Sequence, residues 1–197
     1  GDVKSKTFLD TNASSATYVA AAARPTSTFT LANSSFGTNT ARKITATTAG
    51  TGDNGKTVTI VGKDHNNEDA TEVITLTGSA ETSSGTTTAF LSITSATVSA
   101  QPAANVSLGM TADVFGSIFQ GRTRVRQVNA ESGGSIGSVL FRDGSLTGTA
   151  LLTVRTGATA GDVNTVNIPQ DGILYKDGAF VTFDETQCNS ATVYFDG

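Results

Sequence analysis

Few residues in the chain could perform nucleophilic or acid–base chemistry. There is one histidine, His65, and one cysteine, Cys188. A Ser–His–Asp or Cys–His catalytic group would have to use His65, because such groups need an imidazole as their base. His65 stands in the polar stretch KDHNNEDA, and Cys188 lies far along the chain in TQCNSAT. We therefore expect a solvated loop imidazole, a buried small thiol, and no enzymatic activity.

The acidic loop 64–69 partly matches the start of a calcium-binding loop. Asp64, Asn66 and Glu68 alternate as D-x-N-x-E. Ala70 stands where such a loop requires glycine, and Thr75 stands where it requires a bidentate glutamate. The pattern favours a polar turn between two strands, although it leaves calcium open. No metal or cofactor is expected.

Three alternating arginines, Arg122, Arg124 and Arg126, lie in the stretch GRTRVRQV. Strand alternation would place them on one face, with Thr123, Val125 and Gln127 on the other. One interpretation is a solvated edge strand that its charges protect from aggregation. The other is a basic ridge that contacts acidic residues of a partner, where arginine is favoured by its planar guanidinium.

The elements that would position these residues are predicted to be strands. GKTVTIVG and TEVITLTG alternate between β-branched and polar residues, so Val58 and Ile60 share one face and Ile74 and Leu76 share another. TTTAFLSITSATVSA adds a strand with Phe90, Ile93 and Val98 as expected core residues.

Glycine turns separate the later strands. SVLFRDGS precedes TALLTVRT, and GILYKDGAFVTF is predicted to be a β-hairpin around Asp177-Gly178. Residues 110–120 are predicted to form an interdomain connection with one strand.

The predicted fold is therefore all-β, with two small antiparallel β-sandwich domains of Ig-like or jelly-roll-like type and an extended N-terminal arm. The arm covers residues 1–40 with one short strand, the first sandwich 41–112, and the second 113–197. An arm of this kind could order on a neighbouring subunit. The candidate partner contacts are Phe8, Tyr18, Phe29 and the three arginines.

Composition limits the classes of partner. The formal charge is −4 over 197 residues, and no long basic run is present, so direct nucleic-acid binding is not expected. No apolar run approaches the roughly 20 residues of a membrane helix, and the first residues lack the layout of a secretory signal. A single cysteine excludes an intrachain disulfide. We expect a thin core that oligomerisation or docking on a larger partner would stabilise.

The segment GKTVTIVGKDHNNEDATEVITLTG, with AFLSITSATVSA and NVSLGM after it, resembles a segment frequent in structural proteins of tailed bacteriophages. The matching positions are Val58 to Gly62, Asp64, Thr71-Glu72, Ile74, Leu76, Gly78, Phe90 and Gly109. Residues 66–69 replace the usual glycine-containing turn. The second half, with GRTRVR, FRDGS, IPQDGILYKDGAFV and ATVYF, is similar to a module of small virion proteins from phages of marine and cyanobacterial hosts.

This resemblance covers about residues 42–197 and implies a virion component without catalytic activity. We expect a capsid decoration or cement protein that binds the major capsid protein or other virion proteins and forms a homo-oligomer. Its expected location is the virion, after assembly in the host cytoplasm. Two alternatives stay open: a tail, neck or fibre-attachment protein of the virion, and a bacterial surface binding module.

Overall fold

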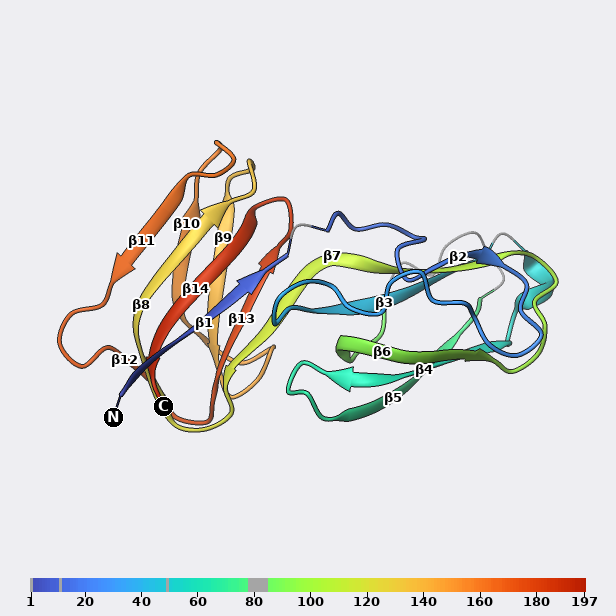
Figure 1. The fold of residues 1–197 in the computed structure, drawn as a ribbon, viewed down its shortest axis with the longest axis horizontal. Helices are drawn as coiled ribbons and strands as arrows, with labels where there is room; N and C mark the ends of the chain where they lie inside the picture. The colour runs from blue at the N-terminus through green and yellow to red at the C-terminus, as the bar shows by residue number, and fades with distance from the viewer. Residues whose placement is uncertain (1, 11, 49, 78–84) are drawn as a thin grey trace. The chain divides into compact units, whose positions relative to one another are not determined.

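The chain folds into antiparallel strands that form two compact units (Figure 1). The computed structural model describes residues 2–10, 12–48, 50–77 and 85–197, and within these ranges it contains one short 3-10 turn, η1 (Thr51–Asp53), and no α-helix. Unit 1 comprises residues 1–13, 37–40 and 112–197, and unit 2 comprises residues 14–36 and 41–111. The all-β prediction is confirmed.

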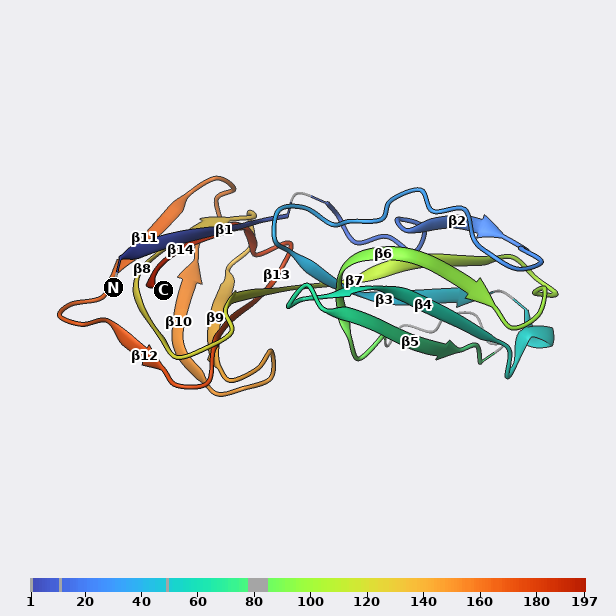
Figure 2. The same cartoon turned by 60° about the horizontal axis from the view of Figure 1, so that its bottom comes forward.

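Unit 1 is a sandwich of two sheets. Its strands are β1 (Val3–Leu9), the second part of β7 (Val106–Phe119), β8 (Thr123–Ser132), β9 (Gly137–Asp143), β10 (Ala150–Thr156), β11 (Val163–Asn167), β12 (Ile173–Tyr175), β13 (Ala179–Asp184) and β14 (Cys188–Asp196). One sheet has the order β1-β14-β8-β11, with β12 also paired to β8. The other runs β10-β9-β13 and ends on β7. The two layers are visible in Figure 2.

The core of unit 1 lies between these sheets. Strict alternation along β14 turns Ala191, Val193 and Phe195 inward, where they are at most 5% exposed. Val139 and Phe141 on β9 meet them from the opposite sheet as members of the same apolar cluster. Burying a side chain of this size contributes about 1.5–3 kcal/mol, so the cluster is the main stabilising feature of the unit.

Unit 2 is built from a second set of strands. These are β2 (Ala20–Ala23), β3 (Ala41–Thr48), β4 (Thr57–Asp64), β5 (Asp69–Thr75), β6 (Ala89–Val98) and the first part of β7. They are hydrogen-bonded in the order β7-β3-β6-β4-β5, with β2 on β7. A separate apolar cluster contains Phe36, Ile60, Phe90 and Leu108, all fully buried.

The predicted faces of unit 2 are confirmed. β4 and β5 form a hairpin in which Val58 pairs with Ile74 and both are buried, whereas Val73 is 54% exposed. Phe90 and Ile93 are core residues, and Val98 packs against the cluster as a partly buried residue.

A buried carboxylate joins two loops of unit 2. Asp53 is fully buried and accepts hydrogen bonds from the backbone N–H groups of Ala103 (2.5 Å) and Ala104 (3.0 Å). It also accepts from Nζ of Lys56 (2.9 Å) and Oγ1 of Thr48 (3.2 Å). Burial would raise the pKa of this carboxyl, but the four donors together hold the pKa well below its usual range.

The structure corrects the prediction of an N-terminal arm over residues 1–40. β1 pairs with β14 in unit 1, from Val3–Asp196 to Leu9–Ser190. Residues 14–36 belong to unit 2, where Val19, Phe29 and Phe36 enter the apolar cluster. The arm prediction missed these strands because their partners lie far away in the sequence, and long-range pairing leaves no local pattern. Unit 2 is thus inserted into unit 1, and the chain changes unit at residues 111–112, close to the predicted boundary.

A second correction concerns the predicted hairpin from Gly172 to Phe183. β12 and β13 exist, but they do not pair with each other: β12 pairs with β8, and β13 lies between β7 and β9 in the other sheet. The turn, in which Gly178 has a φ of +119°, therefore connects the two layers. Tyr175 helps to hold β12 away from β13, because its ring is buried in the core of unit 1 and its hydroxyl donates to the Phe141 carbonyl on β9 (3.4 Å).

Candidate interaction surface

The outer face of the β1-β14-β8-β11 sheet carries an unusual set of side chains. Because the inward positions supply the core, the alternate positions point away from it. At the middle of the sheet these outward residues are uncharged hydroxyl and amide side chains. We call them the neutral face; its members are Ser5, Thr7, Gln127, Asn129, Thr165, Asn167, Thr192 and Tyr194.

The strand register arranges the neutral face in two rows. One row runs Thr7–Thr192–Asn129–Thr165 across the four strands. The next row runs Ser5–Tyr194–Gln127–Asn167. Neighbours within the face bond to one another, because Oγ1 of Thr7 lies 2.9 Å from Oγ1 of Thr192 and Nε2 of Gln127 donates to Oδ1 of Asn129 (3.2 Å).

A β-bulge shapes one end of the neutral face. Val125 pairs with Phe195 and Gln127 pairs with Tyr194, so Arg126 is an extra residue in β8. The bulge lets both Arg126 and Gln127 take outward positions. The sequence-based prediction that Gln127 lies opposite the arginines is therefore wrong, since a bulge shifts the alternation by one residue.

The three arginines differ in their surroundings. Nε of Arg126 donates to the Asp196 carboxylate (3.1 Å to each oxygen), and its Nη2 adds a contact of 2.8 Å. This guanidinium holds the pKa of Asp196 below its usual range. Arg124 contacts the carbonyl oxygens of Asp171 and Gly172 at 3.4 and 3.5 Å. Arg122 is exposed just before β8 begins. Arg122 and Arg124 are thus the cations that could meet acidic groups of a partner.

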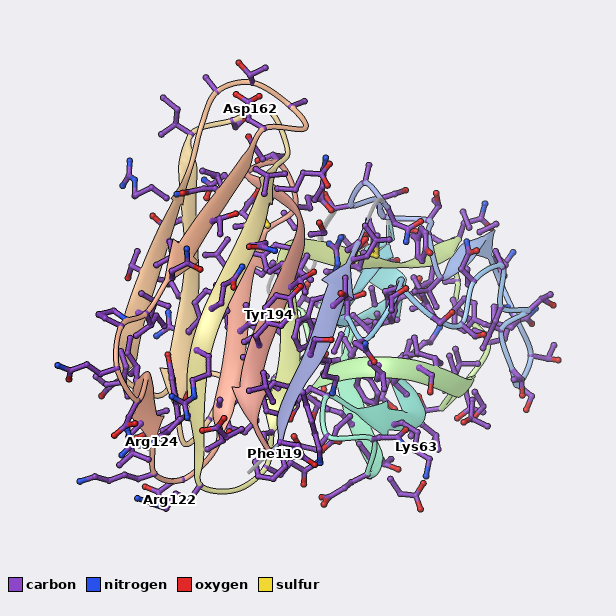
Figure 3. The ribbon with its side chains drawn as sticks, turned by 60° about the vertical axis from the view of Figure 1, so that its left-hand side comes forward. Lys63, Phe119, Arg122, Arg124, Asp162 and Tyr194 are labelled. Atoms are coloured by element: carbon purple, nitrogen blue, oxygen red, sulfur yellow. The ribbon has the colours of Figure 1, made fainter. Side chains whose placement is uncertain are left out.

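The opposite end of the same face is acidic. Glu131 lies on β8 and accepts from Oγ of Ser190 (3.4 Å), and Asp162 is exposed directly before β11. Figure 3 shows Asp162 at one end of this sheet, Arg122 and Arg124 at the other end, and Tyr194 between them. Glu131 is seven residues from Arg124, and because Arg126 is an extra residue of the bulge the strand advances six steps between them, or about 20 Å at the usual rise per residue.

This arrangement suits contact with another macromolecule. Burying a charged group is costly unless it is paired, whereas hydroxyl and amide groups can be buried at small cost when they form hydrogen bonds. Interface centres are depleted in charged residues and enriched in tyrosine. Side chains of serine and threonine also lose little rotamer entropy on contact. The neutral face meets these conditions, and its two charged ends would orient a partner.

Two of the predicted contact residues are buried. Phe8 is fully buried in the core of unit 1, and its ring packs on Gly116. Phe29 is 4% exposed in the core of unit 2. The prediction that these two phenylalanines contact a partner is therefore wrong for the folded chain, because the inner face of a short strand cannot be assigned until its partner strand is known.

Tyr18 is partly exposed. Its ring stacks on Phe36 at a centroid distance of 5.7 Å, and its hydroxyl donates to the Ser35 carbonyl (3.0 Å). A partner contact at Tyr18 stays a prediction, as it does at the arginines.

The sequence carries one signal of the neutral face. Gln127, Asn129 and Glu131 alternate with buried residues on β8, as do Thr192 and Tyr194 on β14. The sequence of each strand shows its own row of outward polar residues. Only the pairing of β14 with β8 shows that these two rows lie side by side.

Edge strand β1 carries a charge that points inward. Lys6 donates from Nζ to the Ser117 carbonyl (2.6 Å), and Nζ lies 5.6 Å from the centre of the Phe8 ring. Burial lowers the pKa of this ammonium. An inward lysine on an edge strand hinders unwanted pairing with another strand.

His65 and Cys188 lie in different units, His65 in unit 2 and Cys188 in unit 1. Cys188 is fully buried, and burial raises the pKa of its thiol to about 12, so it stays protonated at neutral pH. Burial lowers the pKa of His65, against the opposing effect of Asp64 and Glu68.

The acidic loop 64–69 closes as a turn of its own. Oδ1 of Asp64 accepts from the backbone N–H groups of Asn66 (2.8 Å) and Glu68 (3.0 Å). Asn67 takes a φ of +64°. Asp69 pairs with Lys63 at 2.7 Å. These contacts explain the polar residues of the loop as turn-forming groups, and the described part of the chain contains no group of three His, Cys, Asp or Glu residues that could hold a metal ion.

No family model, curated protein or solved structure matches the chain. Among the residues with a described structure, no helix is long and apolar enough to cross a membrane.

Proposed function

We propose that the protein is a non-catalytic structural component of a tailed-phage virion, and that it binds the outside of the head as a decoration or cement protein. The resemblance of residues 42–197 to phage structural segments motivates this proposal. The observation that supports it most directly is the neutral face, because a broad outward sheet surface without central charges is suited to contact with another protein.

Such a protein would stabilise the head by burying surface against the major capsid protein. Each contact that forms only in the assembled shell lowers the free energy of the shell relative to its separated subunits. Arg122 and Arg124 at one end of the neutral face offer guanidinium groups for acidic residues of a capsid partner. Tyr18 in unit 2 offers a partly exposed aromatic ring.

The test is binding to intact particles. Purified protein would be mixed with heads that lack it, the mixture sedimented, and the pellet imaged by cryo-electron microscopy. We expect regularly repeated density on the outer shell and an increase in the temperature at which the heads release DNA. Density confined to the tail or neck would refute the decoration role and favour the tail, neck or fibre alternative. Binding to a bacterial surface glycan without binding to heads would refute the virion role.

A further inference from the structure

The neutral face has opposite charges at its two ends. Arg122 and Arg124 lie at one end and Asp162 lies at the other (Figure 3). Glu131 lies beside Asp162, because it pairs with Val163. Asp196 and Asp171 offset part of the positive charge at the arginine end, where Arg126 lies as well. The roughly 20 Å between Arg124 and Glu131 exceeds the Debye length of about 8 Å at physiological ionic strength, so the two ends act as separate charges. A partner that fits this face must therefore be acidic at one end, basic at the other and uncharged in the middle.

A second copy of the same face has these properties when it is turned around. A two-fold axis that lies in the plane of the interface, perpendicular to the strands and between the Gln127 and Asn129 rows, turns the second copy face to face with the first and exchanges the two ends. The basic end of one copy then meets the acidic end of the other, twice in each pair. The hydroxyl and amide rows meet each other in the middle, with Tyr194 next to the axis.

We infer that the neutral face binds a second copy of this chain, forming a symmetric dimer in which Arg124 of each copy faces Glu131 of the other. The dimer and the proposed capsid contact would use the same face, so the inference concerns the isolated protein, and binding to heads would displace the second copy; failure of the dimer leaves the virion role untouched. The inference identifies the surface through which the expected homo-oligomer forms.

The size of the face sets the strength of this dimer. Four strands about 4.8 Å apart and about seven residues long cover on the order of 400 Å² per copy, or about 800 Å² in the pair. Specific stable interfaces bury about 1,200–2,000 Å². Side chains that project from the sheet increase the buried area above the flat estimate, but the face remains small for a stable interface, so the dimer is weak. We expect a weak dimer that forms at low salt and at high protein concentration, with weaker binding as salt screens the charged ends.

Sedimentation velocity with the full chain measures this association. Wild-type protein, at concentrations from about 10 µM to 1 mM and at low and high salt, should move from monomer to dimer at low salt and dissociate at high salt. A monomer at every concentration and salt, or association that salt does not weaken, would overturn the inference.

Charge reversal tests the register of the two copies. Arg124→Glu alone places like charges at both ends of the dimer, and so does Glu131→Arg. Each variant by itself should raise the dissociation constant about 10- to 100-fold. An equimolar mixture of the two variants has opposite charges at both ends and should return the dissociation constant to within about threefold of wild type. A mixture that stays as weak as the single variants would refute the two-fold arrangement.

A central variant tests the face without depending on the register. Thr192→Lys places an ammonium group next to the axis. There it must lose its hydration and lie near the ammonium group of the other copy, so the dissociation constant should rise at least about 30-fold. The matched control is Thr153→Lys, an exposed position on β10 in the other sheet of unit 1. Circular dichroism would verify that both variants fold. Equal loss in both, or a dimer unaffected by Thr192→Lys, would point to pairing elsewhere, such as at the edges of β1 or β11, and would overturn the inference.

Discussion

The buried carboxylate of Asp53 allows a quantitative prediction. Asp53→Asn keeps the size of the side chain but removes its charge. The amide oxygen can stay with Lys56 and Ala103, while the NH2 group faces Thr48, whose hydroxyl can rotate to accept, and Ala104, whose N–H cannot. Two bonds then weaken by about 1 kcal/mol each, and one buried N–H loses its partner at about 2 kcal/mol. We expect a loss of about 4 kcal/mol of stability in unit 2.

Local unfolding is the appropriate measurement, because the two units need not unfold together. Hydrogen exchange resolved by peptide should show faster exchange over residues 50–56 and 101–104 in the variant. Denaturation followed by tyrosine fluorescence adds a second measure, in which Tyr18 reports on unit 2 and Tyr175 and Tyr194 report on unit 1. The control is Asp69→Asn in the same unit, an exposed ion pair that should change stability by less than about 1 kcal/mol.

The pH dependence of this effect has a definite sign. The pKa of Asp53 is lower in the folded chain than in the unfolded chain, where it is about 3.9. Its stabilisation is therefore fully present above about pH 4 and is lost as pH falls further. The difference between wild type and Asp53→Asn should shrink below pH 4. A stability loss under 1 kcal/mol at pH 7, or a loss equal to that of Asp69→Asn, would refute the assigned role of the carboxylate.

Other perturbations test unit 1. Gly116→Ala places a methyl group 2.3 Å from the Phe8 ring and should destabilise the unit by about 1–3 kcal/mol in chemical denaturation, whereas Gly157→Ala, which has open space around it, should change little. Cys188 should react with a thiol reagent at pH 8 only after denaturant unfolds the chain; rapid labelling of native protein would contradict its burial. Lys6→Val should increase light scattering on storage by removing the charge that protects β1, and unchanged scattering would show that this protection is absent.

Local signals predicted the parts of the fold that form locally. The β4–β5 hairpin joins strands with clear period-two alternation, and its register is the one that buries Val58 and Ile74 together. The hairpin of β9 and β10 also follows its glycine turn, with Gly144 at a φ of +84°. These pairings need only short loops, so the pattern and the turn specify them.

Long-range pairing could not be predicted in the same way. The turn at Gly178 has the residues of a hairpin, yet its two strands are drawn into different sheets by partners elsewhere in the chain. β1 carries Lys4 and Lys6 among few apolar residues, so its sequence resembles a polar terminus until β14 is available to pair with it. The neutral face depends on the same pairings, which explains why the sequence indicated the arginines but not the surface beside them.

The pairing of β1 with β14 affects how the protein is made. Thr7 contacts Thr192, which the ribosome adds 185 residues later. At about 5–20 residues per second, the nascent β1 waits roughly 10–40 s for its partner. Unit 2 can complete its own core in that interval, because all of its strands are synthesised before β8. β14 thus closes the sandwich, and premature termination of translation before residue 188 would release a chain with one finished unit and one that lacks the strand between β1 and β8.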